Sequence, residues 1–421
     1  MISQEENDLI CRVGPGKPLT KLAKTFWLPA YRSDSVEAGG KPERIELLGE
    51  KYIAWRAEDG KLGFFEEACP HRRASLALAR NEDCALTCIY HGWTFGPDGK
   101  ILDIPSEPEA NRERLKAHVK LRHFAHKEVN GVIWVFLGNQ DEIPPFPEFE
   151  FNTLKEPQVL ALRGIVRANW LQVFEAALDS AHLNFLHNGH LEDVGQNVEE
   201  WKLMQDAAPR FEMEKTPYGF KEAAIRDLSD GSTYLRLRHA ALPFFSLVAF
   251  EPHAPQVVVA SIPINDESCV QWLFTFTTEE SIFKLLSAGK KDGEESPMFP
   301  NLNNISEGVG SVENLWNQDR EFMKTHWSGI RGPLPWEDIV VTESMGPIVD
   351  RTKENLASTD IIIIKTRRFI CDMIRANETG EEPQTIGYNI DNLSDLRGVA
   401  IRFSRDVDWK TIDGKNPPKS G

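Results

Sequence analysis

Hydrophobic residues in the first third of the chain follow the two-residue period of β-strands. Strand-like runs lie at residues 52–56 and 62–65, with a turn at residues 58–60 between them, and GVIWVFLG forms a further run at residues 131–138. Two such runs around a short turn are typical of a β-hairpin. The next prolines, which interrupt regular structure, are Pro144, Pro145 and Pro147. This region therefore predicts a small antiparallel β domain that ends at a linker.

The rest of the chain combines strand-like and helical patterns. Strand-like runs lie at residues 234–238, 244–250 and 257–262, and helical candidates lie at residues 314–326 and 352–376. A second, larger domain with a sheet and a long helix near the C-terminus is therefore expected.

The pattern changes halfway through residues 168–190, ANWLQVFEAALDSAHLNFLHNGH. In the first half, the 3.6-residue period of a helix gives one apolar face, formed by Trp170, Val173, Phe174, Ala177 and Leu178. Asp179 and His182 are three residues apart and share one side of such a helix. His182 and His187 are five residues apart, which separates them by about 140° around a straight helix. If the two imidazoles bind one ion, the helix must bend or unwind near Phe185.

Composition narrows the possible classes of protein. A length of 421 residues allows two to three domains, and the net charge of −16 argues against a nucleic-acid groove. The N-terminal sequence lacks the apolar core of a signal peptide, and no apolar run is long enough to cross a membrane. The six cysteines show no paired framework, which predicts a reducing, cytoplasmic setting. Residues 284–304 are charged and contain glycine and proline, and they predict a long loop.

Two short Cys/His motifs lie inside the predicted β domain. Cys69-Pro-His71 is followed, after sixteen residues, by Cys88-Ile-Tyr-His91. Structural zinc usually takes ligand pairs spaced C-x2-4-C or H-x3-5-H around one tetrahedral ion. In a Rieske [2Fe–2S] centre two cysteines bind one iron and two histidines bind the other, so each motif contributes one ligand to each iron. The C-x-H and C-x2-H spacings fit this crosswise arrangement, and structural zinc is the alternative.

The sequence CPHRRASL followed by C-x2-HGW resembles the cluster motif of Rieske aromatic-ring hydroxylating oxygenases. The resemblance implies that Cys69, His71, Cys88 and His91 bind a Rieske 2Fe-2S cluster. A cluster with histidine ligands has a high potential and readily accepts electrons from a ferredoxin or flavin donor. Such a relay requires a second centre that receives the electrons.

The stretch around His182 is similar to the mononuclear-iron motif of the same family, N-W-x-Q-x-x-E-x3-D-x2-H-x4-H. The resemblance implies that His182 and His187 bind a mononuclear Fe(II). His190 lies beyond the end of the motif and is expected to be a neighbouring polar residue. Two imidazoles and one carboxylate form the facial triad of non-heme oxygenases, which leaves positions open for O2 and substrate.

Family members carry the carboxylate ligand about 150 residues further along the chain, with a second acidic residue five positions later. The sequence PWEDIVVTE, residues 335–343, has this form. It favours Asp338 as the third ligand. Asp319, in the sequence NQDR, is the alternative.

The resemblance gives Asp179 a different role. It implies that this carboxylate links a cluster histidine of one subunit, His71 or His91, to His182 of the next subunit. Electron transfer would then require a homotrimer, alone or as two stacked trimers. Glu175 matches a further motif position one helical turn before Asp179, and we expect it either to hydrogen-bond around this bridge or to be solvated.

The sequence ESMGPI at residues 343–348 resembles the phthalate dioxygenase branch of the family. Members of this branch consist of α subunits alone and usually receive electrons from NAD(P)H through a reductase with flavin and plant-type ferredoxin domains. Many of their substrates are aromatic carboxylates, and a guanidinium binds a carboxylate through two parallel hydrogen bonds. Candidate substrate contacts in the sheet region are Arg210, Arg236 and Arg238.

These inferences together define an α+β protein with three parts. Residues 1–41 are expected to pack on the catalytic domain, residues 42–147 to form the Rieske domain and residues 148–421 to form a helix-grip domain, a curved antiparallel sheet around a long C-terminal helix.

The expected function is that of a terminal oxygenase that hydroxylates an aromatic substrate with O2, with dioxygenation favoured. The alternatives are a monooxygenase or O-demethylase of an aryloxy- or methoxy-benzoate, a non-catalytic electron carrier or ligand-binding module, and a zinc-stabilised interaction protein.

Overall fold

The structure, a computed structural model, describes residues 2–155, 157–190, 208–278 and 301–418. It divides into a large unit, Met1–Leu22 with Pro145–Gly421, and a small unit, Ala23–Pro144. The expected boundary after residue 41 differs from this division because strand β1 (Trp27–Arg32) pairs with β10 (Val132–Phe136) inside the small unit. Most of the predicted loop at residues 284–304 lies outside the described residues.

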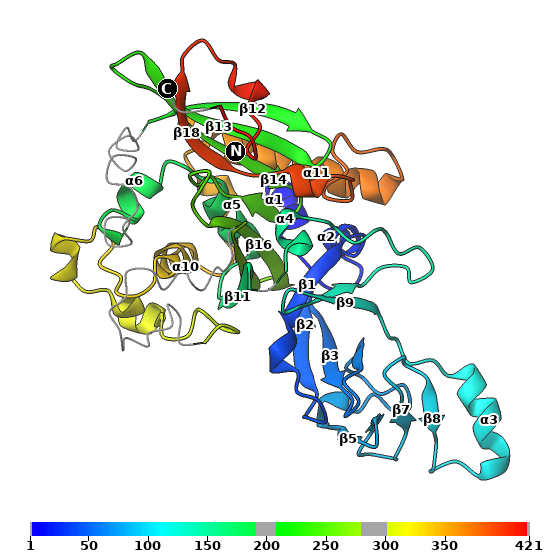
Figure 1. The fold of residues 1–421 in the computed structure, drawn as a ribbon. Coiled ribbons are helices and arrows are strands. Elements are labelled where there is room, and N and C mark those ends of the chain that lie inside the picture. Colours follow the sequence, from blue (N-terminus) through cyan, green and yellow to red (C-terminus); the bar gives the residue numbers. More distant parts are fainter. Residues whose placement is uncertain (1, 156, 191–207, 279–300, 419–421) are drawn as a thin grey trace. The chain divides into compact units, whose positions relative to one another are not determined.

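Three small antiparallel sheets form the small unit, in the strand orders β1-β10-β9, β2-β3-β4 and β5-β6-β7-β8 (Figure 1). The strands besides β1 and β10 are β2 (Glu43–Leu47), β3 (Glu50–Arg56), β4 (Leu62–Glu66), β5 (Arg80–Glu82), β6 (Ala85–Thr87), β7 (Thr94–Phe95), β8 (Ile101–Asp103) and β9 (Ala125–Val129). Helix α3 (Glu109–His118) follows β8. The predicted hairpin is the antiparallel pair β3 and β4, and the first Cys/His motif follows β4 directly.

An eight-stranded antiparallel sheet forms the centre of the large unit, in the order β11-β17-β16-β15-β14-β13-β12, with β18 paired to β14. Its strands are β11 (Val159–Val166), β12 (Arg210–Thr216), β13 (Gly219–Asp227), β14 (Ser232–Ala241), β15 (Phe245–Leu247), β16 (Gln256–Asn265), β17 (Ser268–Phe276) and β18 (Val399–Ser404). The predicted runs at residues 234–238 and 257–262 lie within β14 and β16. The run at residues 244–250 contains only the short strand β15.

The helices of the large unit pack on this sheet or on one another, and some of them carry the candidate site. They are α1 (Gln4–Cys11), α4 (Glu150–Thr153), α5 (Trp170–Leu178), α6 (Leu183–Leu186), α10 (Pro335–Ser344) and α11 (Ile361–Thr379), and α2 (Pro18–Ala23) ends where the small unit begins. Helix α5 lies against β15, β16 and β17. The long helix α11 contacts β12 and β13, and Phe369 stacks on Phe220 with ring centroids 6.0 Å apart.

Short 3-10 helices occur in both units. They are η1 (Ser33–Ser35), η2 (Leu76–Leu78), η3 (Val312–Asn317), η4 (Phe322–Lys324), η5 (Arg351–Lys353), η6 (Ser358–Asp360), η7 (Leu393–Asp395) and η8 (Trp409–Thr411).

Two helix predictions differ from the structure. Residues 314–326 contain parts of η3 and η4 instead of one continuous helix, and Leu315 and Trp316 have φ of 50°. Leu315 is 63% exposed, and Trp316, Phe322 and Met323 are half-buried, so none of these apolar side chains is fully buried. The C-terminal helix begins at Ile361, nine residues after the predicted start, and ends at Thr379, before the left-handed Gly380.

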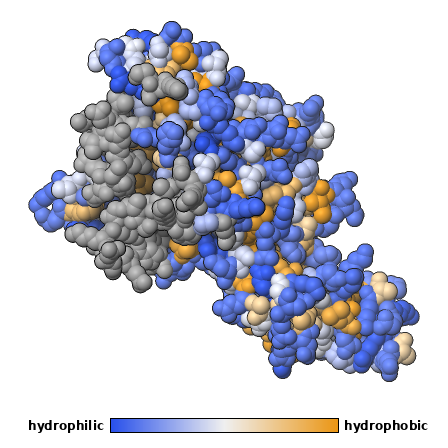
Figure 2. All heavy atoms as spheres, in the orientation of Figure 1, coloured by the Kyte–Doolittle hydropathy of each residue, from blue (hydrophilic) through white to orange (hydrophobic). Residues whose placement is uncertain are grey.

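The α+β class and the two kinds of antiparallel sheet are confirmed. Within the described ranges, no helix combines the length and hydrophobicity that a membrane crossing requires. On the face that Figure 2 shows, hydrophilic residues surround smaller groups of hydrophobic ones. Apolar side chains gather mainly in the cores of the two units.

Candidate metal centres

Helix α5 is anchored at the polar positions of its motif. The side chain of Asn169 accepts a hydrogen bond from the N–H of Leu171 and so caps the helix. The amide of Gln172 donates to the C=O groups of Thr342 (3.0 Å) and Gly346 (2.9 Å). These carbonyls lie at the C-terminal end of α10, so Gln172 fixes α5 relative to the helix that carries Asp338.

Glu175 belongs to a buried ion-pair network. Its carboxylate accepts hydrogen bonds from Arg351 (3.1 Å) and from two nitrogens of Arg367 (2.6 and 3.0 Å), and Arg367 also binds Glu354. Burial raises the pKa of Glu175, but the charges of the two arginines outweigh burial and lower it below its usual value. Glu175 therefore joins α5 to α11 and η5, and it lies neither around the bridge nor in solvent as expected.

The chain leaves the helical conformation at Asp179. Helix α5 ends at Leu178, and Asp179 has extended backbone angles of −81° and 128°. Its carboxylate accepts a hydrogen bond from the N–H of Ala181 at 2.7 Å, which stabilises the turn into α6. The break therefore lies at Asp179, not near Phe185, and the two histidines flank the short helix α6.

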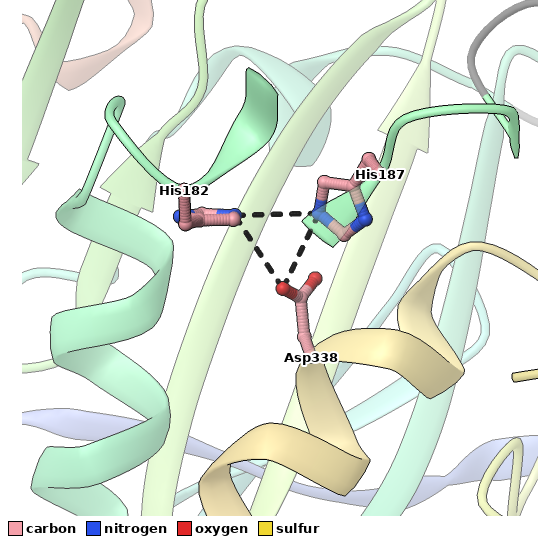
Figure 3. Close-up of side chains that lie close together, drawn as sticks. All are labelled: His182, His187 and Asp338. Carbon is pink, nitrogen blue, oxygen red and sulfur yellow. Dashed lines mark hydrogen bonds and ion pairs between the residues drawn. The ribbon is translucent and has the colours of Figure 1, made fainter. Parts of the chain in front are cut away.

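His182, His187 and Asp338 converge on one point (Figure 3). The Nε2 atoms of the two histidines are 3.3 Å apart, and they lie 3.5 Å and 3.3 Å from Oδ1 of Asp338. Ligand atoms bound at about 2.1 Å, with about 90–110° between bonds, are separated by about 3.0–3.4 Å. The triangle of donor atoms therefore has the size that a transition-metal ion requires.

The charges at this point also favour a cation. Oδ1 of Asp338 is buried and has no hydrogen-bond partner among the described residues. Burial lowers the pKa of His187, but the negative charge of Asp338, followed by the hydrogen bond and charge of Glu337, raises it to about 10. The two-histidine, one-carboxylate set is the donor set of a non-heme Fe(II) site, and a cation there would balance the Asp338 carboxylate.

Each histidine of the triangle has a carboxylate behind its other nitrogen. Nδ1 of His182 lies 3.4 Å from Oδ2 of Asp179. Nδ1 of His187 lies 2.7 Å from Oε2 of Glu337, and Nδ1 of His190 lies 2.9 Å from Oε1 of the same residue. The contact of Glu337 with His187 was not predicted from the sequence. The one indication in the sequence was that Glu337 is next to the predicted ligand Asp338.

Asp319 has a different environment. Oδ1 of Asp319 accepts hydrogen bonds from the N–H groups of Glu321 (2.8 Å) and Phe322 (3.0 Å), and Oδ2 accepts one from Arg331 (2.8 Å). These contacts stabilise the turn into η4. The structure thus brings Asp338, and not Asp319, to the two histidines.

The three arginines proposed as substrate contacts occupy different environments. Arg210 is exposed and pairs with Glu212. Arg238 is buried, pairs with Glu222 at 2.6 Å, and donates to the C=O groups at the end of α5. Arg236 is buried on the same face of β14 as Arg238, two residues away. The charge of Arg238 is therefore already compensated, and its contacts hold the end of α5 that precedes Asp179.

The two Cys/His motifs of the small unit form matching turns. The N–H of Arg73 donates to the C=O of Cys69 at 2.9 Å, and the N–H of Gly92 donates to the C=O of Cys88 at 3.0 Å. Arg73 and Gly92 both have positive φ, 61° and 74°. At Gly92 a Cβ atom would approach Pro105 to 2.7 Å, so only glycine fits.

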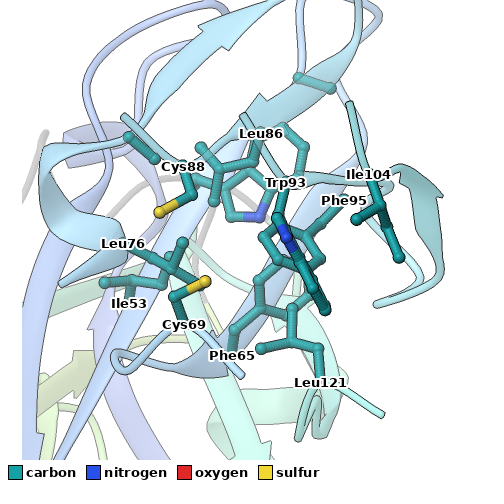
Figure 4. Packing of buried hydrophobic residues seen from close by; sticks show 13 residues of the cluster. Ile53, Phe65, Cys69, Leu76, Leu86, Cys88, Trp93, Phe95, Ile104 and Leu121 are labelled. Atoms are coloured by element: carbon teal, nitrogen blue, oxygen red, sulfur yellow. The ribbon is translucent and has the colours of Figure 1, made fainter. Parts of the chain in front are cut away.

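Cysteines and histidines separate into an inner and an outer pair. Cys69 and Cys88 are buried in the hydrophobic core (Figure 4). The ring centroids of His71 and His91 are 4.5 Å apart, and Trp93 stacks on His71 at 4.9 Å. His71 is exposed. An inner iron held by thiolates and an outer iron held by imidazoles is the arrangement of a Rieske cluster.

The thiol of Cys69 fits a metal-bound state. Burial raises its pKa to about 11, and Cys88 adds to this effect. The N–H groups of His71 and Arg72 oppose the shift, because they stabilise a negative sulfur. A buried thiol pair needs positive charge to ionise, and iron supplies it. These residues therefore fit a [2Fe–2S] cluster.

Two family models match the chain. Residues 26–124 match the Rieske [2Fe-2S] domain, and residues 135–418 match the family described as LigXa C-terminal domain like. The chain is 34% identical to the 3-chlorobenzoate-3,4-dioxygenase oxygenase subunit of Comamonas testosteroni, over 98% of both chains. It is 31% identical to the phthalate 4,5-dioxygenase oxygenase subunit of Pseudomonas putida, over 99% of this chain and 95% of that protein.

More distant relatives share the architecture. The 5,5'-dehydrodivanillate O-demethylase oxygenase subunit of Sphingobium sp. is 28% identical over 92% of this chain and 84% of its own length. The solved structure of NdmA from Pseudomonas putida CBB5 with caffeine covers 93% of this chain and all of its own, with a TM-score of 0.58 and 17% identity. At that identity the likeness concerns the fold alone.

The buried network around Glu175 leads to a stability prediction. Glu175→Gln removes the negative charge that pairs with Arg351 and one of the two carboxylates that pair with Arg367. We therefore expect the free energy of unfolding of the large unit to fall by about 3–5 kcal/mol. Urea denaturation followed by tryptophan fluorescence measures this. Glu354→Gln is the control, because Glu354 is more exposed than Glu175 and, among the residues that the structure describes, pairs with Arg367 alone. If the free energy of unfolding falls by the same small amount in both variants, Glu175 is not a stabilising centre of this ion-pair network.

Proposed function

The chain belongs to the Rieske non-heme iron oxygenases, in the branch of phthalate 4,5-dioxygenase, and on this premise we propose that it is the oxygenase subunit that dihydroxylates an aromatic carboxylate. One observation carries the proposal: His182, His187 and Asp338 converge in a chain that also contains the Rieske motif. The names of the two relatives that align over 95% or more of both chains specify chlorobenzoate and phthalate, and both are aromatic carboxylates.

The proposed reaction adds both atoms of O2 to the ring and consumes two electrons and two protons, which NAD(P)H and one proton supply through a partner reductase. When bound, the cluster passes single electrons and the mononuclear iron activates O2 beside the substrate. Cys69, His71, Cys88 and His91 hold the cluster. His182, His187 and Asp338 would hold the iron, and three protein ligands leave coordination positions for O2 and substrate.

Arg236 is the substrate contact that we retain from the three arginines. It follows Tyr234 by two residues on the same face of β14, and Tyr234 belongs to an apolar cluster against which Leu183 and Leu334 pack. Leu183 is adjacent to His182, and Leu334 lies one helical turn before Asp338. A carboxylate of the substrate bound by Arg236 would therefore orient the aromatic ring toward the iron site.

Asp179 is the proposed entry point of the electrons. Its carboxylate lies 3.4 Å from His182 and is 31% exposed, which leaves room for a cluster histidine of a neighbouring subunit. This role requires a homotrimer or two stacked trimers. The partner that supplies electrons is a reductase, which we propose to contain flavin and ferredoxin domains. A cytoplasmic location remains a prediction.

Oxidative O-demethylation is the second candidate, favoured by the similarity to the 5,5'-dehydrodivanillate O-demethylase oxygenase subunit. In that reaction one oxygen atom enters the methyl group and the other is reduced to water. Mass spectrometry after turnover under 18O2 separates the two, because a dioxygenase places both labelled atoms in the ring product. The non-catalytic and zinc alternatives have no comparable support, since the named relatives are oxygenase subunits over nearly their full length.

A screen of aromatic acids tests the activity. With a ferredoxin-type reductase and NADH, we expect one benzoate or phthalate derivative to produce coupled O2 uptake and NADH oxidation at near-equal molar amounts. Non-carboxylated analogues should react more slowly, because they lack the group that Arg236 binds. Tight coupling with non-carboxylated aromatics alone would contradict the substrate class.

Removal of a proposed iron ligand should separate the two centres. Asp338→Ala, like His182→Ala or His187→Ala, should lose one iron per chain and all turnover, while the visible absorbance of the cluster persists because its ligands lie in the other unit. Metal analysis and absorbance spectra measure this. Asp319→Ala is the matched control and should keep its iron. Loss of iron in the Asp319 variant alone would favour the alternative ligand.

Asp179→Asn should stop product formation without loss of either metal. We expect turnover to fall by at least about 100-fold, because the bridge loses its charge while the iron ligands stay in place. Single-turnover assays with the cluster reduced beforehand measure electron transfer from the cluster to the mononuclear site directly. A single-turnover rate equal to that of the unmodified protein would refute the bridge.

A further inference from the structure

Glu337 is the most completely enclosed carboxylate near the metal site. It lies in the first turn of α10 and is fully buried. Oε2 faces Nδ1 of His187 at 2.7 Å. Oε1 accepts a hydrogen bond from the hydroxyl of Ser328 and lies 2.9 Å from Nδ1 of His190. Both oxygens are therefore engaged, and the carboxylate has little freedom to rotate.

These contacts determine which nitrogen of His187 can bind a metal. An imidazole that donates a proton from Nδ1 to a carboxylate presents an unprotonated Nε2 on the opposite side of the ring. In this site that side faces Asp338 and His182, as Figure 3 shows for the two rings.

We propose that Glu337 is a positioning residue of the mononuclear metal site, which fixes the ring and the tautomer of His187, and that His190 and Ser328 hold Glu337 in turn. This inference rests on the proposed function of His182, His187 and Asp338 as metal ligands. It gives His190 a place in the site as a support for the carboxylate behind a ligand.

Consecutive residues of α10 perform the two tasks. Side chains of neighbouring helix residues point about 100° apart, so Asp338 reaches the donor triangle while Glu337 reaches behind His187. The ligand and the support for another ligand therefore move as one body. His182 is held differently, since its carboxylate neighbour Asp179 is 3.4 Å away and partly exposed. Of the two histidines, His187 is the more firmly fixed.

Charge supports the same arrangement. Glu337 and Asp338 place two carboxylates in the interior on adjacent residues, and such charges are unfavourable there without compensation. A divalent ion among the three ligands balances both. Removal of the Glu337 charge should therefore weaken metal binding, even though no atom of this residue belongs to the donor triangle.

Metal affinity of the Glu337→Gln variant tests the proposal. Iron is removed from the mononuclear site of the full chain, with the cluster retained, and Co(II) is titrated in competition with a chelator. We expect about 10–100-fold weaker binding, since glutamine keeps the size but loses the charge and one acceptor. We also expect an altered EPR spectrum of the bound Co(II), because His187 is free to rotate. Glu337→Asp should recover part of the affinity.

Glu343→Gln is the matched control. Glu343 lies on the same helix, is also buried, and binds Arg167 and Trp316, away from the histidines. Its variant should bind Co(II) with the affinity and spectrum of the unmodified protein. Equal losses in both variants would mean that Glu337 only stabilises α10, and an unchanged affinity in Glu337→Gln would overturn the proposal.

Two further variants keep the outcomes distinguishable. Ser328→Ala removes one support of Glu337 and should weaken Co(II) binding a few-fold, a change that remains measurable if Glu337→Gln does not fold; unchanged affinity here would also count against the proposal. Asp338→Ala should abolish Co(II) binding at this site. If Asp338→Ala still binds Co(II) at full affinity, the metal site itself is misassigned. If it does not bind while Glu337→Gln binds normally, only the positioning role fails.

Discussion

Burial of ionisable groups is the constraint on which the candidate active site depends. Two imidazoles and two carboxylates meet in the interior of the large unit, where charged groups are stable only when they are paired. Protons satisfy this requirement incompletely, because Oδ1 of Asp338 stays without a hydrogen bond among the described residues. A divalent ion meets it fully. The same principle operates in the small unit, where two buried thiols require positive charge.

The framework around the site is built to keep these groups together. Gln172 binds α5 to the end of α10, and Glu175 binds α5 to α11 through two arginines. Arg238 holds the C-terminal end of α5 just before the chain turns at Asp179. Most polar positions of the motif that contains the histidines thus serve the framework. The two histidine ligands lie in its C-terminal part, after α5 has ended, where side chains can converge.

The sequence allowed much of this to be predicted. Alternation predicted the hairpin of β3 and β4, and the resemblance to the family's mononuclear-iron motif predicted that His182, His187 and Asp338 lie together. Three features were not predictable from local pattern. The helix break at Asp179, the pairing of Glu175 with Arg351, and the contact of Glu337 with His187 depend on residues more than 100 positions apart or on a capping contact that periodicity does not report. The expected helix at residues 314–326 is interrupted, because Leu315, Trp316 and Asn317 have positive φ.

Anomalous X-ray diffraction at the iron absorption edge, from crystals of iron-loaded protein, tests the central claim most directly. Two separate peaks per chain are expected. The stronger should lie beside Cys69 and Cys88, and the weaker should lie within the triangle of His182, His187 and Asp338. Iron-loaded crystals with no density inside that triangle would contradict the account.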